Sequence, residues 1–204
     1  MLSERGAGNL ETQDRRIRRT QKLLAKALIQ VTIEKGYDAV TVRDITDRAD
    51  VGYATFYRHY QDKDALLEDV LEVVLNELVG LLSPDIDQSA EPGKLGAILF
   101  GYVKDHYEII RVLLSSRYTS VIGKRMIEDS TKKMLNLHVP KPDSLIPPEI
   151  AAYHLISSSI NLIEWWLVED MRYSPEQMGL IYYELIEKPT IMLAFNPVKG
   201  ERRK

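Results

Sequence analysis

Residues 41–63 read TVRDITDRADVGYATFYRHYQDK, and this stretch decides the fold. Thr41, with Asp44 three residues later, has a pattern close to that of a capping box at a helix N-terminus. Residues 50–52, Asp-Val-Gly, carry a turn signal, and a second short helix is predicted over residues 53–60. Two short helices separated by a tight turn are typical of motifs that place their second helix in the DNA major groove.

A longer helix is predicted before this stretch, over residues 14–35. Its apolar residues Leu24, Leu28 and Val31 recur at helical spacing, and Gly36 follows where a helix commonly ends. Six cations lie in its first half: Arg15, Arg16, Arg18, Arg19, Lys22 and Lys26. A charge run is usually a solvated helix face, but six cations opposed by one acid also fit a position near phosphate.

Many residue types stand at fixed spacing between residues 14 and 70: Gly36-Tyr37, Thr41-Val42-Arg43-Asp44-Ile45, Ala49, Val51, Thr55-Phe56-Tyr57-Arg58-His59-Tyr60 and Lys63-Asp64-Ala65-Leu66-Leu67. In this combination they resemble the DNA-binding domain of the TetR family of bacterial transcriptional regulators. The turn departs from the family pattern, since Asp50 replaces a common glycine and Gly52 replaces a common Ser or Thr cap. Asp tolerates the left-handed region and Gly is an acceptable cap, so we expect the turn to be preserved.

The resemblance implies eight DNA-contacting residues: Thr41, Arg43, Tyr53, Ala54, Thr55, Tyr57, His59 and Lys63. Arg43 is expected to reach a guanine edge or a phosphate, and Tyr53 and Thr55 to face the major groove. Ala54 and the Thr55 methyl group could meet a thymine methyl. Phosphate contacts are expected from the remaining four: Thr41, Tyr57, His59 and Lys63. The alternative for His59 is a buried histidine with a satisfied hydrogen bond.

The rest of the sequence predicts further helices, among them one over residues 94–115 and a last one that ends near Lys188-Pro189. The fold is therefore expected to be all-α with about nine helices. Residues 1–13 are predicted as a flexible arm, 14–62 as the DNA-binding domain, 63–195 as a helical regulatory and dimerisation domain, and 196–204 as a tail. Residues 64–82 form the helix expected to link the two domains. Loops are predicted at residues 83–93 and 140–148.

In this family the last two long helices of two subunits form a four-helix dimer interface. The run SSINLIEWWLVEDMRYSPEQM also resembles the C-terminal domain of one TetR subgroup. The expected interface residues are Ala151, Leu155, Ser158, Leu162, Trp166, Met178, Tyr182 and Leu185. The family also implies an effector pocket, for which the candidates are Tyr102, His106, Tyr107, Arg117, Tyr118, Met134 and Trp165. Ordinary core or interface packing is the alternative for each pocket candidate.

Composition and motifs exclude several kinds of site. The chain has no cysteine, which rules out disulfides and thiolate metal sites and suits a reducing cytoplasm. None of the four histidines has metal-ligand spacing, and no phosphate loop or nucleophile motif is present. We therefore predict no catalytic residue, metal or cofactor. The first 60 residues carry an excess of three positive charges, whereas the whole chain has a net charge of -3.

The sequence thus predicts a cytoplasmic homodimeric repressor that binds a roughly palindromic double-stranded DNA operator, responds to a small effector and does not contact membranes. One alternative is a helical ligand-binding or enzymatic bundle with a vestigial helix-turn-helix. Another is a co-regulator that dimerises but hardly binds DNA.

Overall fold

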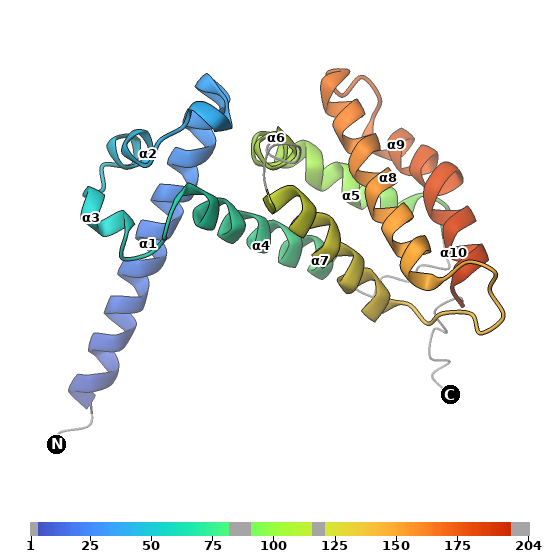
Figure 1. Cartoon of the computed structure of the whole chain (residues 1–204), viewed down its shortest axis with the longest axis horizontal. Coiled ribbons are helices and arrows are strands. Elements are labelled where there is room, and N and C mark those ends of the chain that lie inside the picture. The colour runs from blue at the N-terminus through green and yellow to red at the C-terminus, as the bar shows by residue number, and fades with distance from the viewer. Residues whose placement is uncertain (1–3, 82–90, 116–120, 197–204) are drawn as a thin grey trace. The chain divides into compact units, whose positions relative to one another are not determined.

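Helices form most of the described chain in a computed structural model that describes residues 4–81, 91–115 and 121–196 (Figure 1). Their bounds are α1 Glu4–Lys35, the 3-10 turn η1 Tyr37–Ala39, α2 Val42–Ala49, α3 Tyr53–Phe56, α4 Lys63–Leu81, α5 Lys94–Asp105, α6 Tyr107–Ser115, α7 Val121–Leu137, α8 Pro148–Val168, α9 Pro175–Tyr182, the π-helical η2 Tyr183–Glu187 and α10 Lys188–Ala194. Because α9, η2 and α10 run on without a break, the described residues form nine helical segments besides η1. The all-α prediction is confirmed. No helix of the described part is both long and apolar enough to cross a membrane.

The described residues fall into two compact units, Met1–Glu72 and Val73–Lys204. In the first unit, α1 buries Leu24, Leu28 and Val31, as the sequence periodicity predicts. These residues form part of the core, to which α2 adds Ile45 and α3 adds Phe56, both fully buried. The core residues of α1, α2 and α3 therefore hold the helix-turn-helix as one body.

α1 is longer than predicted, because it begins at Glu4 rather than near residue 14. Residues 4–13 contain two glycines and no apolar periodicity, which is why an irregular arm was expected. Once a helix is nucleated, however, each added residue gains one backbone hydrogen bond without a further nucleation cost. The packed part of α1 supplies that nucleus. The first three residues of the predicted arm, residues 83–90 of a predicted loop, and residues 197–204 of the predicted tail lie outside the described residues.

The boundary between the units falls inside α4, ten residues beyond the predicted boundary at residues 62 and 63. The first half of α4 buries Leu66, Leu67 and Val70. In addition, Tyr60 donates a hydrogen bond to Asp69 over 2.6 Å. These contacts make the start of α4 part of the first unit, although the motif that is visible in the sequence ends at residue 63.

In the second unit, α5 and α9 approach each other closely at glycines. A Cβ atom at Gly96 would lie 2.8 Å from the Cα of Gly179, and one at Gly179 would lie 2.4 Å from the backbone nitrogen of Ala97. Next to this contact Trp166 is fully buried, with Phe100 edge-on at 5.2 Å between ring centroids. The Trp166 Nε1 donates to the carbonyl of Tyr173 over 3.0 Å, so the polar group of the buried indole is satisfied.

Two helices of the second unit also differ from their predicted lengths. The helix predicted over residues 94–115 is interrupted at His106, which leaves helical geometry at φ −120 and ψ 27. The last helix was expected to end near Pro189, but α10 continues to Ala194. Proline lacks the amide hydrogen that an α-helix needs there, and the preceding turn is π-helical, with the Lys188 amide bonded to the Tyr183 carbonyl. The chain thus accommodates the proline and the helix goes on.

Candidate nucleic-acid interface

The N-terminus of α2 is fixed by a capping box. The Thr41 hydroxyl accepts from the Asp44 amide over 3.3 Å, and the Asp44 carboxylate accepts from the Thr41 amide over 2.8 Å. Lys35 lies 2.6 Å from the same carboxylate. The lysine and the Thr41 donors hold the pKa of Asp44 well below its ordinary value. The capping box that the sequence pattern predicted is confirmed, and it leaves the Thr41 hydroxyl partly engaged within the protein.

The turn between the two helices has the predicted conformation. Asp50 is left-handed, with φ 53 and ψ 46. Gly52 has φ −60 and ψ 138 and acts as the N-cap, its carbonyl accepting from the Thr55 amide over 2.7 Å. The carbonyl of Thr46 accepts from the Val51 amide, which helps to close α2. The unusual residues at positions 50 and 52 therefore preserve the helix-turn-helix geometry.

The second helix of the motif, α3, is shorter than predicted. It ends at Phe56 rather than near residue 60. The following residues form tighter bonds, from the Arg58 amide to the Thr55 carbonyl and from the His59 amide to the Phe56 carbonyl. Such three-residue turns are common at helix ends. The predicted contact residues Tyr57 and His59 therefore stand on this turn instead of on the helix proper.

Five of the predicted contact residues are exposed: Thr41, Arg43, Tyr53, Ala54 and Tyr57. The Arg43 side chain is 85% exposed, and its Nε lies 3.9 Å from Asp47. The two tyrosine hydroxyls are 3.2 Å apart, and their rings meet edge-on. The two neighbouring hydroxyls and the guanidinium are thus each exposed on the motif, where they can donate to phosphate or base edges.

Arg58 also belongs to this surface, although the sequence analysis did not select it. Its side chain is exposed, and its Nη2 donates to the Thr55 hydroxyl over 3.0 Å. Thr55 and His59 are half-buried, so His59 is not the fully buried histidine of the alternative interpretation. The signal for Arg58 was its position between two predicted contact residues. It is a cation next to Tyr57, on a segment already assigned to DNA.

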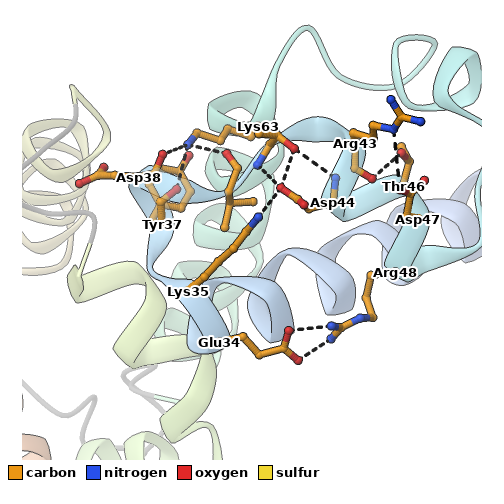
Figure 2. A network of polar contacts seen from close by, with 12 residues as sticks. Glu34, Lys35, Tyr37, Asp38, Arg43, Asp44, Thr46, Asp47, Arg48 and Lys63 are labelled. Atoms are coloured by element: carbon orange, nitrogen blue, oxygen red, sulfur yellow. Dashed lines mark hydrogen bonds and ion pairs between the residues drawn. The ribbon is translucent and has the colours of Figure 1, made fainter.

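Lys63 does not lie free for a phosphate, which differs from the predicted role. Figure 2 shows its side chain reaching from α4 across η1. Its ammonium donates to the carbonyls of Tyr37 over 2.8 Å and Val40 over 2.9 Å, and lies 3.5 Å from the carbonyl of Asp38. Three carbonyls occupy the three donors of the ammonium.

A bidentate ion pair ties α2 to α1 on its other side. The two guanidinium nitrogens of Arg48 donate to the two carboxylate oxygens of Glu34 over 2.8 and 2.7 Å (Figure 2). Fork-to-fork geometry of this kind constrains orientation more than a single contact does. Together with Lys35 and Asp44, this pair fixes how α2 presents Arg43.

Comparison with known proteins identifies the family of both units. A model of the TetR family of bacterial regulatory proteins matches residues 24–70, the segment that carries the helix-turn-helix. A model described as a transcriptional regulator C-terminal region matches residues 97–188. The chain belongs to the TetR family.

Individual relatives agree with the TetR assignment. YxbF of Bacillus subtilis, described as an HTH-type transcriptional regulator, is 27% identical over 180 residues, covering 85% of this chain and 46% of its own length. DhaR of Mycobacterium sp., a transcriptional repressor, is 33% identical over 63 residues, or 31% of this chain and 32% of its own. The chain therefore spans less than half the length of these curated relatives. A solved TetR-family structure from Syntrophomonas wolfei has a TM-score of 0.68 at 15% identity, covering 85% of this chain and 96% of its own, which shows the fold.

The second unit of this TetR protein contains a cavity of about 620 Å³. It is lined by Glu77, Gly80, Leu81, Ile98, Gly101, Tyr102, Asp105 and His106. Tyr102 and His106, both predicted pocket residues, stack at 4.2 Å between ring centroids, and the Tyr102 hydroxyl donates to Glu77 over 2.7 Å. Burial and this carboxylate raise the pKa of Tyr102, so the phenol stays protonated. The described residues hold no cluster of three potential metal ligands.

The other predicted pocket residues do not line this cavity. Tyr107 and Trp165 are exposed, and Met134 is buried elsewhere in the second unit. Arg117 and Tyr118 lie outside the described residues. Aromatic and polar residue types were used to predict the pocket, but residue type alone does not reveal which side of a helix faces a cavity.

Most of the predicted dimer residues lie inside the chain. Five of them are buried within the chain itself: Ala151, Leu155, Trp166, Met178 and Tyr182. Ser158 and Leu162 are half-buried, and Leu185 is 67% exposed. A residue buried in its own core offers little surface to a partner, so the positions of these five give no support to their predicted role. The chain instead exposes large apolar residues on α8 and along α9 to α10: Ile150, Tyr153, Trp165, Val168, Leu180, Leu185, Met192 and Leu193.

Proposed function

We propose that this TetR protein is a DNA-binding transcriptional repressor that acts as a homodimer on a roughly palindromic double-stranded operator. One observation carries the proposal. A helix-turn-helix with intact caps and turn exposes Arg43, Tyr53, Ala54, Tyr57 and Arg58 on one unit. TetR proteins are transcriptional regulators, and neither the family match nor the cavity favours the alternative of an enzymatic bundle.

The chemistry of the exposed residues assigns their roles. Arg43 can donate two hydrogen bonds to guanine O6 and N7 or contact a phosphate, and Ala54 can meet a thymine methyl. The hydroxyls of Tyr53 and Tyr57 and the guanidinium of Arg58 suit phosphate oxygens, which fix register rather than sequence. Base reading is therefore assigned mainly to Arg43 and α3.

Two copies would place two such surfaces in successive major grooves about 34–36 Å apart. The exposed apolar residues of α8 and of the run from α9 to α10 supply the surface through which the copies associate. A dimer of this kind bound at an operator obstructs transcription, and the similarity to the repressor DhaR supports this sign of regulation.

The cavity supports a small effector. Glu77, Gly80 and Leu81 belong to α4, the helix that begins in the first unit. A ligand that changes the position of α4 in the second unit would therefore favour one of two states of the first, which is how an effector could release DNA. The aromatic stack of Tyr102 and His106 suits a partly apolar molecule.

Selection of bound sequences from random DNA fragments, followed by equilibrium binding, tests the DNA-binding proposal. Arg43→Ala should weaken the selected operator about 10–100-fold, because one good arginine–guanine contact contributes about 1–3 kcal/mol. Binding to random DNA should change much less. Arg111→Ala, an exposed arginine of α6, is the matched control and should bind like wild type. Equal discrimination of operator and random DNA by wild type and Arg43→Ala would refute the base-reading role.

A further inference from the structure

The inference concerns Lys63, Tyr37 and Asp64, and it rests on the proposed DNA binding. Lys63 is the first residue of α4, where a cation opposes the helix dipole. Its presence therefore does not stabilise α4 by itself. Helix N-capping is done by Asp62, whose carboxylate accepts from the Ala65 amide over 2.8 Å.

Contacts with η1 offset the unfavourable position of the Lys63 charge at the start of α4. Carbonyls at the end of a helix carry partial negative charge. Lys63 donates to the carbonyls of Tyr37 and Val40, the first of which also accepts from the Val40 amide over 3.1 Å. Its ammonium lies 4.5 Å from the centroid of the Tyr37 ring. The cation thus binds the negative end of η1 and also contacts an aromatic face.

Tyr37 makes a second contact between η1 and α4. Its ring is buried, and its hydroxyl donates to the carboxylate of Asp64. Burial and the neighbouring carboxylates raise the pKa of Tyr37, which keeps the phenol protonated as a donor. Two adjacent residues at the start of α4 therefore hold one residue of η1, one at its backbone and one at its hydroxyl.

Residues 37–40 lead directly into the capping box of α2. A hydrogen bond that fixes the Val40 carbonyl therefore acts next to Thr41, and Arg43 follows two residues later (Figure 2). We propose that Lys63, with Tyr37 and Asp64, is a positioning residue that sets α2 relative to α4 and so orients Arg43 for DNA, and that it does not contact a phosphate. We call the three residues the η1–α4 joint.

The salt dependence of operator binding separates positioning from phosphate contact. A lysine that neutralises a phosphate contributes about 0.9 to the slope of log K against log salt concentration. Lys63→Gln should weaken operator binding about tenfold, the loss expected when a hydrogen bond to a charged group disappears. Its salt slope should equal that of wild type, and its melting temperature should fall. Lys94→Gln, an exposed lysine at the start of α5, controls for the lost charge.

Two further variants keep the proposal falsifiable. Lys63→Arg retains the charge, but a planar guanidinium cannot converge on the same carbonyls, so it should fail to restore affinity. Tyr37→Phe removes only the bond to Asp64, and its effects on affinity and melting should be non-additive with those of Lys63→Gln. The proposal would be overturned if Lys63→Gln lowered the salt slope by about 0.9 per protomer without changing the melting temperature, and Lys63→Arg restored full affinity. Fully additive effects of Tyr37→Phe and Lys63→Gln would overturn it as well. Wild-type protein that selects no DNA would refute the proposed function instead, and the coupling in melting would still test the joint.

Discussion

Glu187 carries a carboxyl group into the interior of the second unit. Among the described residues its Oε2 is a buried oxygen with no hydrogen-bond partner. Burial raises the pKa of Glu187 to about 7, above an ordinary value of 4.5. Between these pH values the folded protein keeps a proton that the unfolded chain has lost. The free energy of unfolding therefore falls as pH rises through this window.

Removing this charge should stabilise the protein above neutral pH. We expect Glu187→Gln to raise the free energy of unfolding at pH 8 by on the order of 2 kcal/mol, and to leave it nearly unchanged below pH ~4.5, where both forms are neutral. Urea denaturation at the two pH values measures this. Glu184→Gln, an exposed neighbour that pairs with Lys188, should change stability by less than about 1 kcal/mol at either pH. A variant no more stable than wild type at pH 8 would contradict the assignment.

Single residues also show where sequence reasoning succeeds. The capping pair of Thr41 and Asp44 and the left-handed Asp50 follow from local chemistry, and both were predicted correctly. Trp165 and Trp166 were not distinguished correctly, since the first is 41% exposed and the second fully buried. Two neighbours on a helix point in different directions, and only packing decides which one is inside.

At the scale of elements, the contact between α5 and α9 is governed by the absence of side chains. Gly93, Gly96 and Gly179 stand where the two helices meet, and any Cβ there would approach within 3.0 Å of another atom. Close approach lets backbone pack against backbone over the length of α9. No sequence pattern indicated this contact, because a glycine within a helical pattern indicates only weak helix propensity and says nothing about a neighbouring helix.

Gly179→Ala should therefore destabilise the protein, although alanine is the better helix former. The new Cβ would lie 2.4 Å from the Ala97 nitrogen and 2.5 Å from the Gly93 carbonyl oxygen. We expect a loss of about 3 kcal/mol or more in the free energy of unfolding, since backbone cannot move aside cheaply. Gly101→Ala in the facing helix α5 meets nothing within 4 Å and should be neutral or stabilising by up to about 1 kcal/mol. Thermal melting of both proteins makes the comparison, and equal melting temperatures would show that α9 can shift.

The lengths of elements were predicted less well than their existence. α3 is one turn long, and the segment after it tightens into three-residue turns instead of extending the helix. α1 and α10 extend beyond their predicted ends, through residues 4–13 and past Pro189. Helix continuation depends on cooperativity and on neighbouring turns, which a residue-by-residue pattern does not contain.

At the scale of the whole molecule, the exposed apolar faces of α8 and of α9 to α10 predict self-association. Val168→Asp combined with Leu185→Asp should shift sedimentation from dimer to monomer, because charges inside an apolar interface are costly. The matched control is Leu145→Asp, whose side chain is 97% exposed in the loop before α8, and it should remain dimeric. Circular dichroism should show unchanged helix content in both. A double variant that sediments as a dimer would place the interface elsewhere.

The helix-turn-helix could be predicted from sequence because its cap and its turn are local signals. The interior of the second unit could not, since burial there depends on how α5, α8 and α9 pack in three dimensions. The residues that line the cavity include both predicted and unpredicted ones. Tyr102 and His106 were predicted, but Glu77 and Asp105 were not, because nothing local marks them as facing the same space.

The position of the unit boundary inside α4 has a consequence for how such a chain can be divided. A cut after residue 62 would remove Leu66, Leu67 and Val70 from the first unit and expose its remaining apolar core residues to water. A fragment that extends through Glu72 keeps them. Recombination that joins this first unit to a different second unit would therefore succeed only when the junction lies within or beyond the second half of α4. The segment that must be inherited as one piece is thus longer than the helix-turn-helix itself.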